Sequence, residues 1–125
     1  MRKILIILLL PFIFASSGYA QSWSKKDNTL FTLFATGIFI DCMQTNYIFT
    51  HNRFEERNSV IRSGVKSMGR TFIPLYFTTL IFSTRYILNK FPNNHRKYIL
   101  SGLIMVESIN AIQNMSYGYG LSLEF

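Results

Sequence analysis

The sequence predicts an all-α fold: a small membrane helical bundle of three short transmembrane helices, following an N-terminal signal peptide and ending in a short extended tail. Three observations predict this class. Hydrophobic residues supply 49% of the 125 residues and charged residues only 15%, whereas an ordinary soluble domain has about 25% charged residues. The apolar residues gather in three segments of roughly bilayer-crossing length, and the chain begins with the pattern of an export signal.

Residues 1–20 predict a cleavable secretory signal peptide. A basic pair precedes an apolar run over residues 4–15, and small residues lead up to Ala20. A helix over that run would rise only about 18 Å, which is short of a hydrocarbon core of roughly 30 Å. We therefore expect cleavage after Ala20 and a single helical membrane domain over residues 21–125, with an uncleaved anchor as the alternative.

Three apolar segments are the candidate spans, and they cover residues 29–49, 71–88 and 98–115. The first would rise about 31 Å as a helix and the later two about 27 Å, near the lower limit for crossing a bilayer. Pro74 lies in the first turn of the second span, where its missing backbone donor costs little. The third span carries several polar residues, so we expect it to insert against the other two or only partly.

Polar residues within these spans recur three and four positions apart, which places them on one face of each helix. They are Asp41, Gln44 and Thr45 in the first span, Arg85 in the second, and Glu107, Asn110 and Asn114 in the third. Because lipid offers such groups no partner, these faces are expected to turn inward and form one polar cluster. In that arrangement Arg85 would reach Glu107, and Asn110 would lie level with Asp41.

The export signal sets the expected orientation in the bacterial inner membrane. It places residues 50–70 in the cytoplasm and residues 89–97 in the periplasm. The basic residues do not decide the matter, because five fall on each side: Arg53, Arg57, Arg62, Lys66 and Arg70 on one, and Lys25, Lys26, Lys90, Arg96 and Lys97 on the other. The orientation therefore depends on the signal peptide.

The C-terminal tail suggests a different localisation. Apolar residues alternate strictly with small or polar ones from Ser116 to Phe125, and this resembles the terminal strand of outer-membrane proteins. The residues before it do not alternate. We therefore keep the outer membrane as the alternative to the inner membrane.

Nucleotide and nucleic-acid binding are disfavoured by the context of the relevant residues. Residues 64–71 are similar to the phosphate-binding loop G-x-x-x-x-G-K-[ST], with Arg70 in place of lysine. That loop needs a preceding strand, whereas this segment precedes an apolar span. The formal charge of +7 is spread over termini and loops, so anionic lipid headgroups explain it better than nucleic acid does.

No cofactor or metal site is expected. His51, Glu55 and Glu56 are close enough in sequence to offer metal ligands, but a solvated, charge-paired segment beside the membrane explains them better. Cys42 is the only cysteine and is predicted to be a buried thiol. The signatures H-E-x-x-H, G-x-S-x-G and C-x-x-C do not occur in the sequence.

The order Asp41-Cys-Met-Gln44-Thr45, then Glu56-Arg-Asn58, then an apolar helix, Asn114 and a tail ending in Phe resembles a family of small uncharacterised multipass membrane proteins of proteobacteria and their phages. The pattern of that family is D-x-x-Q-T followed by E-x-N-P, and Ser59 stands here where the proline is expected. The resemblance implies that Glu56 and Asn58 join Asp41, Gln44 and Thr45 in the polar cluster.

Two functions follow from this interpretation. The first is a non-enzymatic accessory or interaction protein of the inner membrane, in contact with lipid and with a second copy or another membrane protein, in which the polar residues hold the helices together. The alternative is a small oligomeric transporter or proton-linked channel that uses Asp41 and Glu107. An intramembrane enzyme is less favoured, since it would need a substrate-sized cavity and a carboxylate of raised pKa.

Overall fold

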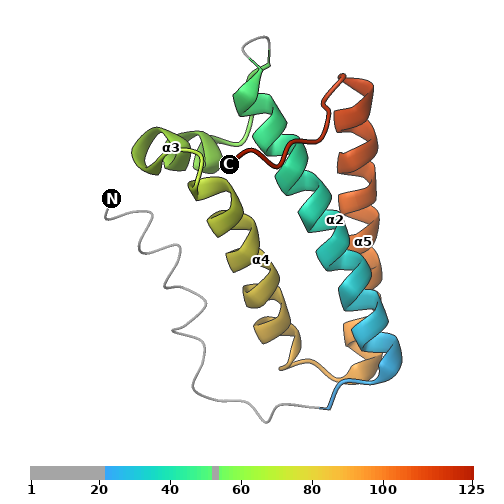
Figure 1. The fold of residues 1–125 in the computed structure, drawn as a ribbon. Helices are drawn as coiled ribbons and strands as arrows, with labels where there is room; N and C mark the ends of the chain where they lie inside the picture. The colour runs from blue at the N-terminus through green and yellow to red at the C-terminus, as the bar shows by residue number, and fades with distance from the viewer. Residues whose placement is uncertain (1–21, 52–53) are drawn as a thin grey trace.

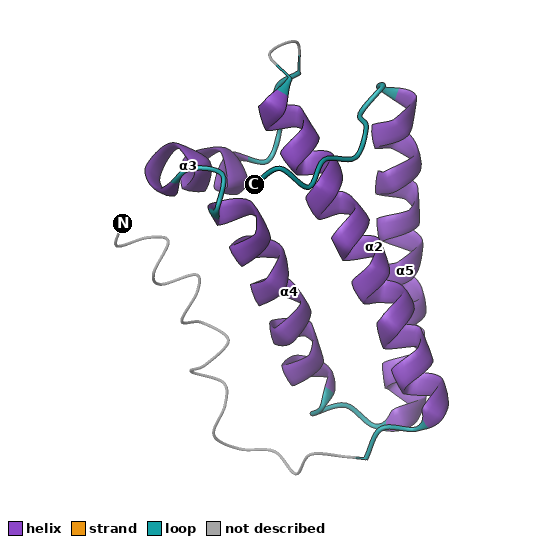
Figure 2. Ribbon diagram, viewed as in Figure 1, coloured by secondary structure: helices purple, strands orange, loops and turns teal. Residues whose placement is uncertain are grey.

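The computed structural model describes residues 22–51 and 54–125, and in these residues it contains only helices and loops (Figures 1 and 2). The prediction of an all-α fold is confirmed. The helices are α2 (Lys25–Thr50), α3 (Ser59–Met68), α4 (Phe72–Leu88) and α5 (Asn93–Ser116). The predicted signal peptide, residues 1–20, lies outside the described residues.

Helix α2 begins at a capping box. The Ser24 hydroxyl accepts a hydrogen bond from the Asp27 backbone N–H at 3.1 Å, and the Asp27 carboxylate accepts one from the Ser24 backbone N–H at 2.9 Å. These bonds satisfy donors that a helix start leaves without intrahelical partners. The helix therefore starts at Lys25, four residues before the predicted span of residues 29–49.

Helix α3 was not predicted, because residues 50–70 were interpreted as a loop. Its start is fixed by Asn58, whose side-chain oxygen accepts hydrogen bonds from the backbone N–H groups of Val60 at 3.0 Å and Ile61 at 3.4 Å. It ends at Met68 and is followed by the C-cap residue Gly69, which has the positive φ of 75° that glycine adopts easily. The missed signal was a short amphipathic pattern behind a good N-cap residue.

Helices α4 and α5 both pack against α2, and α3 lies across the N-terminal end of α4 (Figure 1). Helix α4 closely follows the predicted residues 71–88, whereas α5 begins five residues before the predicted 98. The buried core runs along the helices and includes Phe34, Ile38, Cys42, Ile61, Ile73, Phe77, Leu88 and Leu100. The burial of Cys42 agrees with its prediction.

The tail after α5 forms no strand within the described part of the chain and runs across α2 (Figure 2). The backbone N–H of Ser122 donates to the carbonyl of Met43 at 3.2 Å. The Asn46 side chain donates to the Ser122 carbonyl at 3.3 Å and to the Glu124 carbonyl at 2.9 Å. The alternating pattern thus corresponds to an irregular segment fastened to α2 by a buried asparagine.

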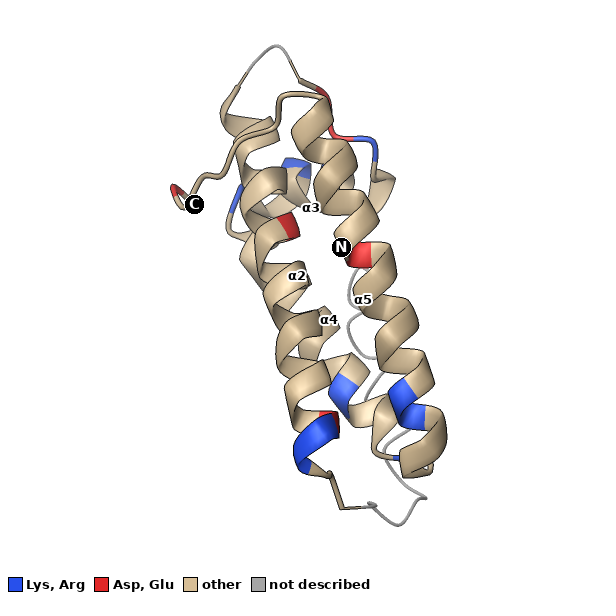
Figure 3. Cartoon of the chain, turned by 90° about the vertical axis from the view of Figure 1, so that its right-hand side faces the viewer, with Lys and Arg blue, Asp and Glu red and all other residues tan. Residues whose placement is uncertain are grey.

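Most charged residues lie toward the two ends of the bundle, and Asp41 in α2 and Glu107 in α5 are the acidic residues between them (Figure 3). No Lys, Arg, Asp or Glu occurs in residues 28–40 of α2, 71–84 around α4, or 98–106 of α5. In the described residues, no helix has both the length and the apolar character needed to cross a membrane. The crossing of a bilayer therefore stays a prediction.

Candidate functional site

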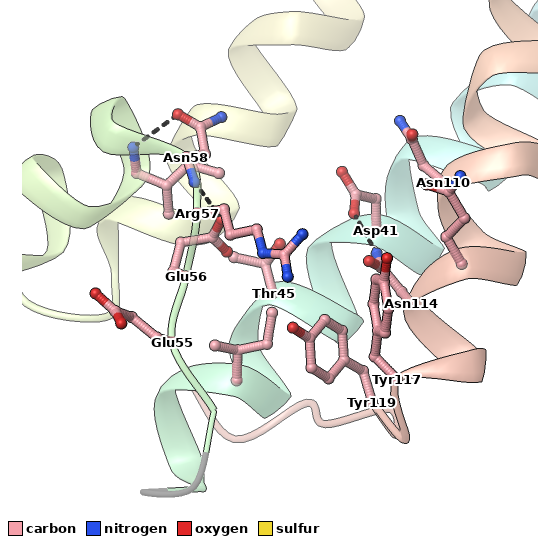
Figure 4. A pocket seen from close by; sticks show the side chains of 13 residues that line it. Asp41, Thr45, Glu55, Glu56, Arg57, Asn58, Asn110, Asn114, Tyr117 and Tyr119 are labelled. Carbon is pink, nitrogen blue, oxygen red and sulfur yellow. Dashed lines mark hydrogen bonds between the residues drawn. The ribbon is translucent and has the colours of Figure 1, made fainter.

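A polar cavity of about 230 Å³ lies at the end of the bundle near α3, between α2, the segment before α3, the end of α5 and the tail (Figure 4). Several of its lining residues are those that the sequence selected as a polar cluster. They are Asp41, Thr45, Glu56, Asn58, Asn110 and Asn114. The remaining predicted members, Gln44, Glu107 and Arg85, do not line the cavity.

Gln44 connects the inner side of this site to α5. It is fully buried, its side-chain nitrogen donates to the Ala111 carbonyl at 3.3 Å, and its oxygen accepts from the Asn114 side chain at 3.0 Å. The same Asn114 nitrogen lies 3.4 Å from an Asp41 carboxylate oxygen. Asn114, rather than the expected Asn110, is therefore the α5 residue that links to Asp41.

The outer side of the cavity is formed by charged residues that precede α3. A carboxylate oxygen of Glu56 accepts from the Asn58 backbone N–H at 2.7 Å, which holds this carboxylate close to the start of α3. The guanidinium carbon of Arg57 lies 5.3 Å from the centre of the Tyr117 ring. Glu55 pairs with the exposed Arg62 at 3.1 Å.

Glu107 lies deeper in the bundle than the cavity, against Gly37 of α2. A Cβ atom on Gly37 would be 2.9 Å from the Glu107 Cβ, so only glycine permits this close approach of α2 and α5. One carboxylate oxygen of Glu107 is buried without a hydrogen-bond partner among the described residues. Asp41 lies close enough to Glu56 and to Glu107 for its charge to interact with both carboxylates.

Arg85 lies at the opposite end of the bundle, and the expected pairing with Glu107 is not formed between these described residues. Its guanidinium carbon is 3.4 Å from the centre of the Trp23 ring, and it donates to the Asn28 side chain at 3.1 Å. An aromatic face attracts a guanidinium group. Arg85 is only partly buried, and Trp23 is its partner in place of the expected Glu107.

Sequence reasoning missed the buried ion pair between Arg96 and Asp27, which lies at the same end. Both side chains are fully buried, and their charged atoms are 3.4 Å apart. Burial acts to raise the pKa of Asp27, but the hydrogen bonds with Ser24 and the charge of Arg96 outweigh it and hold the pKa below its usual value. Arg96 was counted as a loop cation, and no local sequence signal shows that it meets a carboxylate 69 positions away.

The arrangement of the cavity limits its chemistry. In residues 22–51 and 54–125, no three His, Cys, Asp or Glu side chains are placed to hold a metal ion together. What the cavity offers is a set of hydrogen-bonding amides, carboxylates and one guanidinium group, which suits the recognition of a small polar molecule.

No family model, curated protein or solved structure matches the chain.

Proposed function

We propose that this chain is an integral membrane protein whose helical bundle is embedded in a bacterial inner membrane, where it acts as a non-enzymatic accessory or interaction protein. The observation that carries the proposal is the amount of apolar side chain exposed between the two charged ends. Phe82 is 70% exposed, Ile112 67% and Met105 65%. Further exposed apolar residues of the same zone are Leu33, Phe39, Leu75, Val106 and Ile109.

A folded protein in water rarely leaves so many large apolar side chains exposed on neighbouring helices. Lipid removes that cost, because acyl chains solvate apolar side chains. The stretches of residues 28–40 in α2 and 71–84 around α4 contain no charged residue. Helices α2 and α5, with 26 and 24 residues, would rise about 39 and 36 Å, more than a hydrocarbon core of roughly 30 Å. The charged ends would then lie among the headgroups.

The single tryptophan of the chain allows a direct test. The end of the bundle opposite the cavity is called the basic end here, because it carries Lys25, Lys26, Arg85, Lys90, Arg96 and Lys97. Trp23 lies at this end, beside Arg85, so its fluorescence should be quenched most by lipids brominated close to the headgroup. In a Trp23→Phe background, Phe82→Trp places the probe in the exposed apolar zone of α4. That tryptophan should be quenched most by lipids brominated near the acyl-chain ends.

Two results would contradict the proposal. One is quenching of the residue-82 probe that does not depend on bromine depth. The other is release of the chain from membranes by carbonate at high pH, which removes peripheral proteins and leaves embedded ones.

A second candidate function, proton-linked transport, is favoured by one observation. Asp41 and Glu107 both lie at the α2–α5 contact, and a Glu107 oxygen has no hydrogen-bond partner within the described residues. Carboxylates inside a membrane bundle often serve proton paths. Asp41→Asn separates the two functions. In vesicles holding a pH-sensitive dye, it should abolish proton flux if the carboxylate carries protons, and should change neither flux nor folding if it only joins helices.

A further inference from the structure

We propose that the polar cavity binds a small zwitterion, whose primary ammonium group is held by Asp41 and whose anionic group is held by Arg57. The inference goes beyond the membrane placement, because it concerns a ligand of the cavity and is measured on detergent-solubilised protein. It starts from two opposite charges that line one space and do not pair with each other.

Asp41 has most of its acceptor capacity free. Its one hydrogen bond within the described residues is the long contact of 3.4 Å from Asn114, whereas an ionised carboxylate offers about four acceptor sites. Figure 4 shows the carboxylate pointing into the cavity. An ammonium group has three donors and no acceptor, so it matches this oxygen-rich end.

Arg57 provides the opposite charge. It makes no ion pair or hydrogen bond among residues 22–51 and 54–125, and its contact is with the Tyr117 ring. Figure 4 shows its guanidinium group reaching into the same space as Asp41. A guanidinium group has five donors in a planar fork and binds phosphate or carboxylate oxygens in pairs.

The rest of the lining supports a ligand with both charges. Asp41, Glu55 and Glu56 against Arg57 leave an excess of negative charge, which favours an ammonium group over an anion alone. Glu55 is already paired with Arg62, so Asp41 and Glu56 remain as the acidic groups. The side-chain amides of Asn110 and Gln113 line the cavity and make no hydrogen bond within the described parts of the chain, so they are available to the ligand.

The size of the cavity restricts the ligand further. Its volume of about 230 Å³ is below the roughly 300–1,000 Å³ of pockets for drug-sized molecules. Ethanolamine phosphate has the required groups on a short spacer. It exists as a free solute, and the same ammonium and phosphate groups form the headgroup of a zwitterionic phospholipid, in which the phosphate carries a second ester bond. The charged end of an embedded bundle would meet both forms.

Calorimetry on the full chain in detergent tests the charge pairing with three probes: ethanolamine phosphate, ethanolamine and inorganic phosphate. The zwitterion should bind about tenfold or more tightly than either half, because each half loses one charge-assisted contact. Equal affinity for inorganic phosphate and ethanolamine phosphate would overturn the assignment of the ammonium group to Asp41. Absence of zwitterion binding would overturn the whole proposal.

Two variants assign the two ends. Arg57→Gln should weaken the binding of ethanolamine phosphate and phosphate by about tenfold and leave ethanolamine unchanged. Asp41→Asn should weaken ethanolamine phosphate and ethanolamine and leave phosphate unchanged. The control is Lys66→Gln, since Lys66 is an exposed cation of the nearby helix α3 that does not line the cavity.

Arg57 is exposed, so its replacement should not disturb folding even if the Asp41 variant does. Zwitterion binding that is unchanged by Arg57→Gln therefore contradicts the proposal on its own.

Reconstitution distinguishes the two sources of the ligand. If a lipid headgroup occupies the cavity, the chain should bind free ethanolamine phosphate in nanodiscs of phosphatidylglycerol but not in nanodiscs of phosphatidylethanolamine. Equal binding in both would indicate a free zwitterion. If the chain does not bind the zwitterion in detergent, the proposal for the cavity is contradicted. If the chain does not enter nanodiscs, the proposed membrane placement is contradicted, so the two proposals can fail separately.

Discussion

Arg96 and Asp27 form a completely buried ion pair in which the guanidinium group is bound from several directions. Besides the contact with Asp27 at 3.4 Å, Arg96 donates to the backbone carbonyls of Leu88 at 3.1 Å, Phe91 at 2.9 Å and Ser22 at 3.3 Å. A buried charge is tolerated when it is paired and its donors are satisfied in this way. The beginnings of α2 and α5 and the end of α4 are therefore joined at one residue.

Replacing Arg96 with Met should destabilise the fold by about 3–5 kcal/mol, because it leaves the Asp27 carboxylate buried without its partner. The free energy of unfolding can be followed by the fluorescence of Trp23, which contacts Arg96. Lys26→Ala is the control, since Lys26 is an exposed neighbour of Asp27 and should change stability by no more than about 0.5 kcal/mol. Similar effects from both replacements would contradict the prediction.

The same ion pair predicts a dependence of stability on acid. The pKa of Asp27 is lower in the folded chain than its usual value. The ionised carboxylate therefore stabilises the fold, and this contribution is complete at pH values above the usual pKa of about 3.9. That contribution should decline as the pH falls from there through the folded pKa. In unfolding measured at a series of pH values, Asp27→Asn should lack this part of the acid-induced loss. If the free energy of unfolding changed with pH in the same way for the parent and the variant, Asp27 would not contribute to the acid dependence of stability.

Two glycines should respond in opposite ways to alanine. A Cβ at Gly64 would lie 2.1 Å from a ring carbon of Phe72, so Gly64→Ala should destabilise the α3–α4 contact by about 1–3 kcal/mol. Gly102 in α5 has nothing within 4 Å of that position, and Gly102→Ala should stabilise the helix by roughly 0.5–1 kcal/mol. Thermal unfolding followed by circular dichroism gives both values, and a stabilising Gly64→Ala would contradict the packing described here.

Asn46→Ala should release the tail from α2. The fully buried Asn46 side chain donates to the Ser122 carbonyl and hydroxyl and to the Glu124 carbonyl, so its loss leaves those groups without this donor and should cost about 1–3 kcal/mol. Hydrogen exchange should become faster at the backbone N–H of Ser122, which donates to Met43. Asn94→Ala, at an exposed position, should leave that exchange unchanged.

The sequence predicted those parts of the molecule that depend on local patterns. Apolar runs located the three long helices, and helical spacing brought Asp41 and Asn114 into one site. Their partners could not be predicted at the same level, because a spacing within one helix does not fix the rotation of that helix against its neighbour. Asn110 and Asn114 share a face, and packing decided that Asn114 bonds to Asp41.

Contacts between residues distant in sequence escaped prediction more completely. Arg85 contacts Trp23, and Arg96 pairs with Asp27. Both contacts form because the end of α4 and the beginning of α5 lie beside the beginning of α2. Helix α3 was not predicted for a different reason. Its amphipathic pattern is only ten residues long and lies in a charged segment that is typical of a loop. A cap residue such as Asn58 ahead of spaced apolar residues was the local evidence for it.

The fastening of three segments at Arg96 has a mechanical consequence for the cavity, which lies at the far end of the same helices. If the helices tilt against one another, Arg96 is the natural pivot, and displacement grows with distance along α2 and α5. The largest movement would then occur where Asp41, Asn114 and Tyr117 surround the hollow. Widening of the cavity by such a tilt would leave the bonds of the buried arginine in place, but it would break the hydrogen bonds that Gln44 and Asn114 make between α2 and α5 at the cavity end.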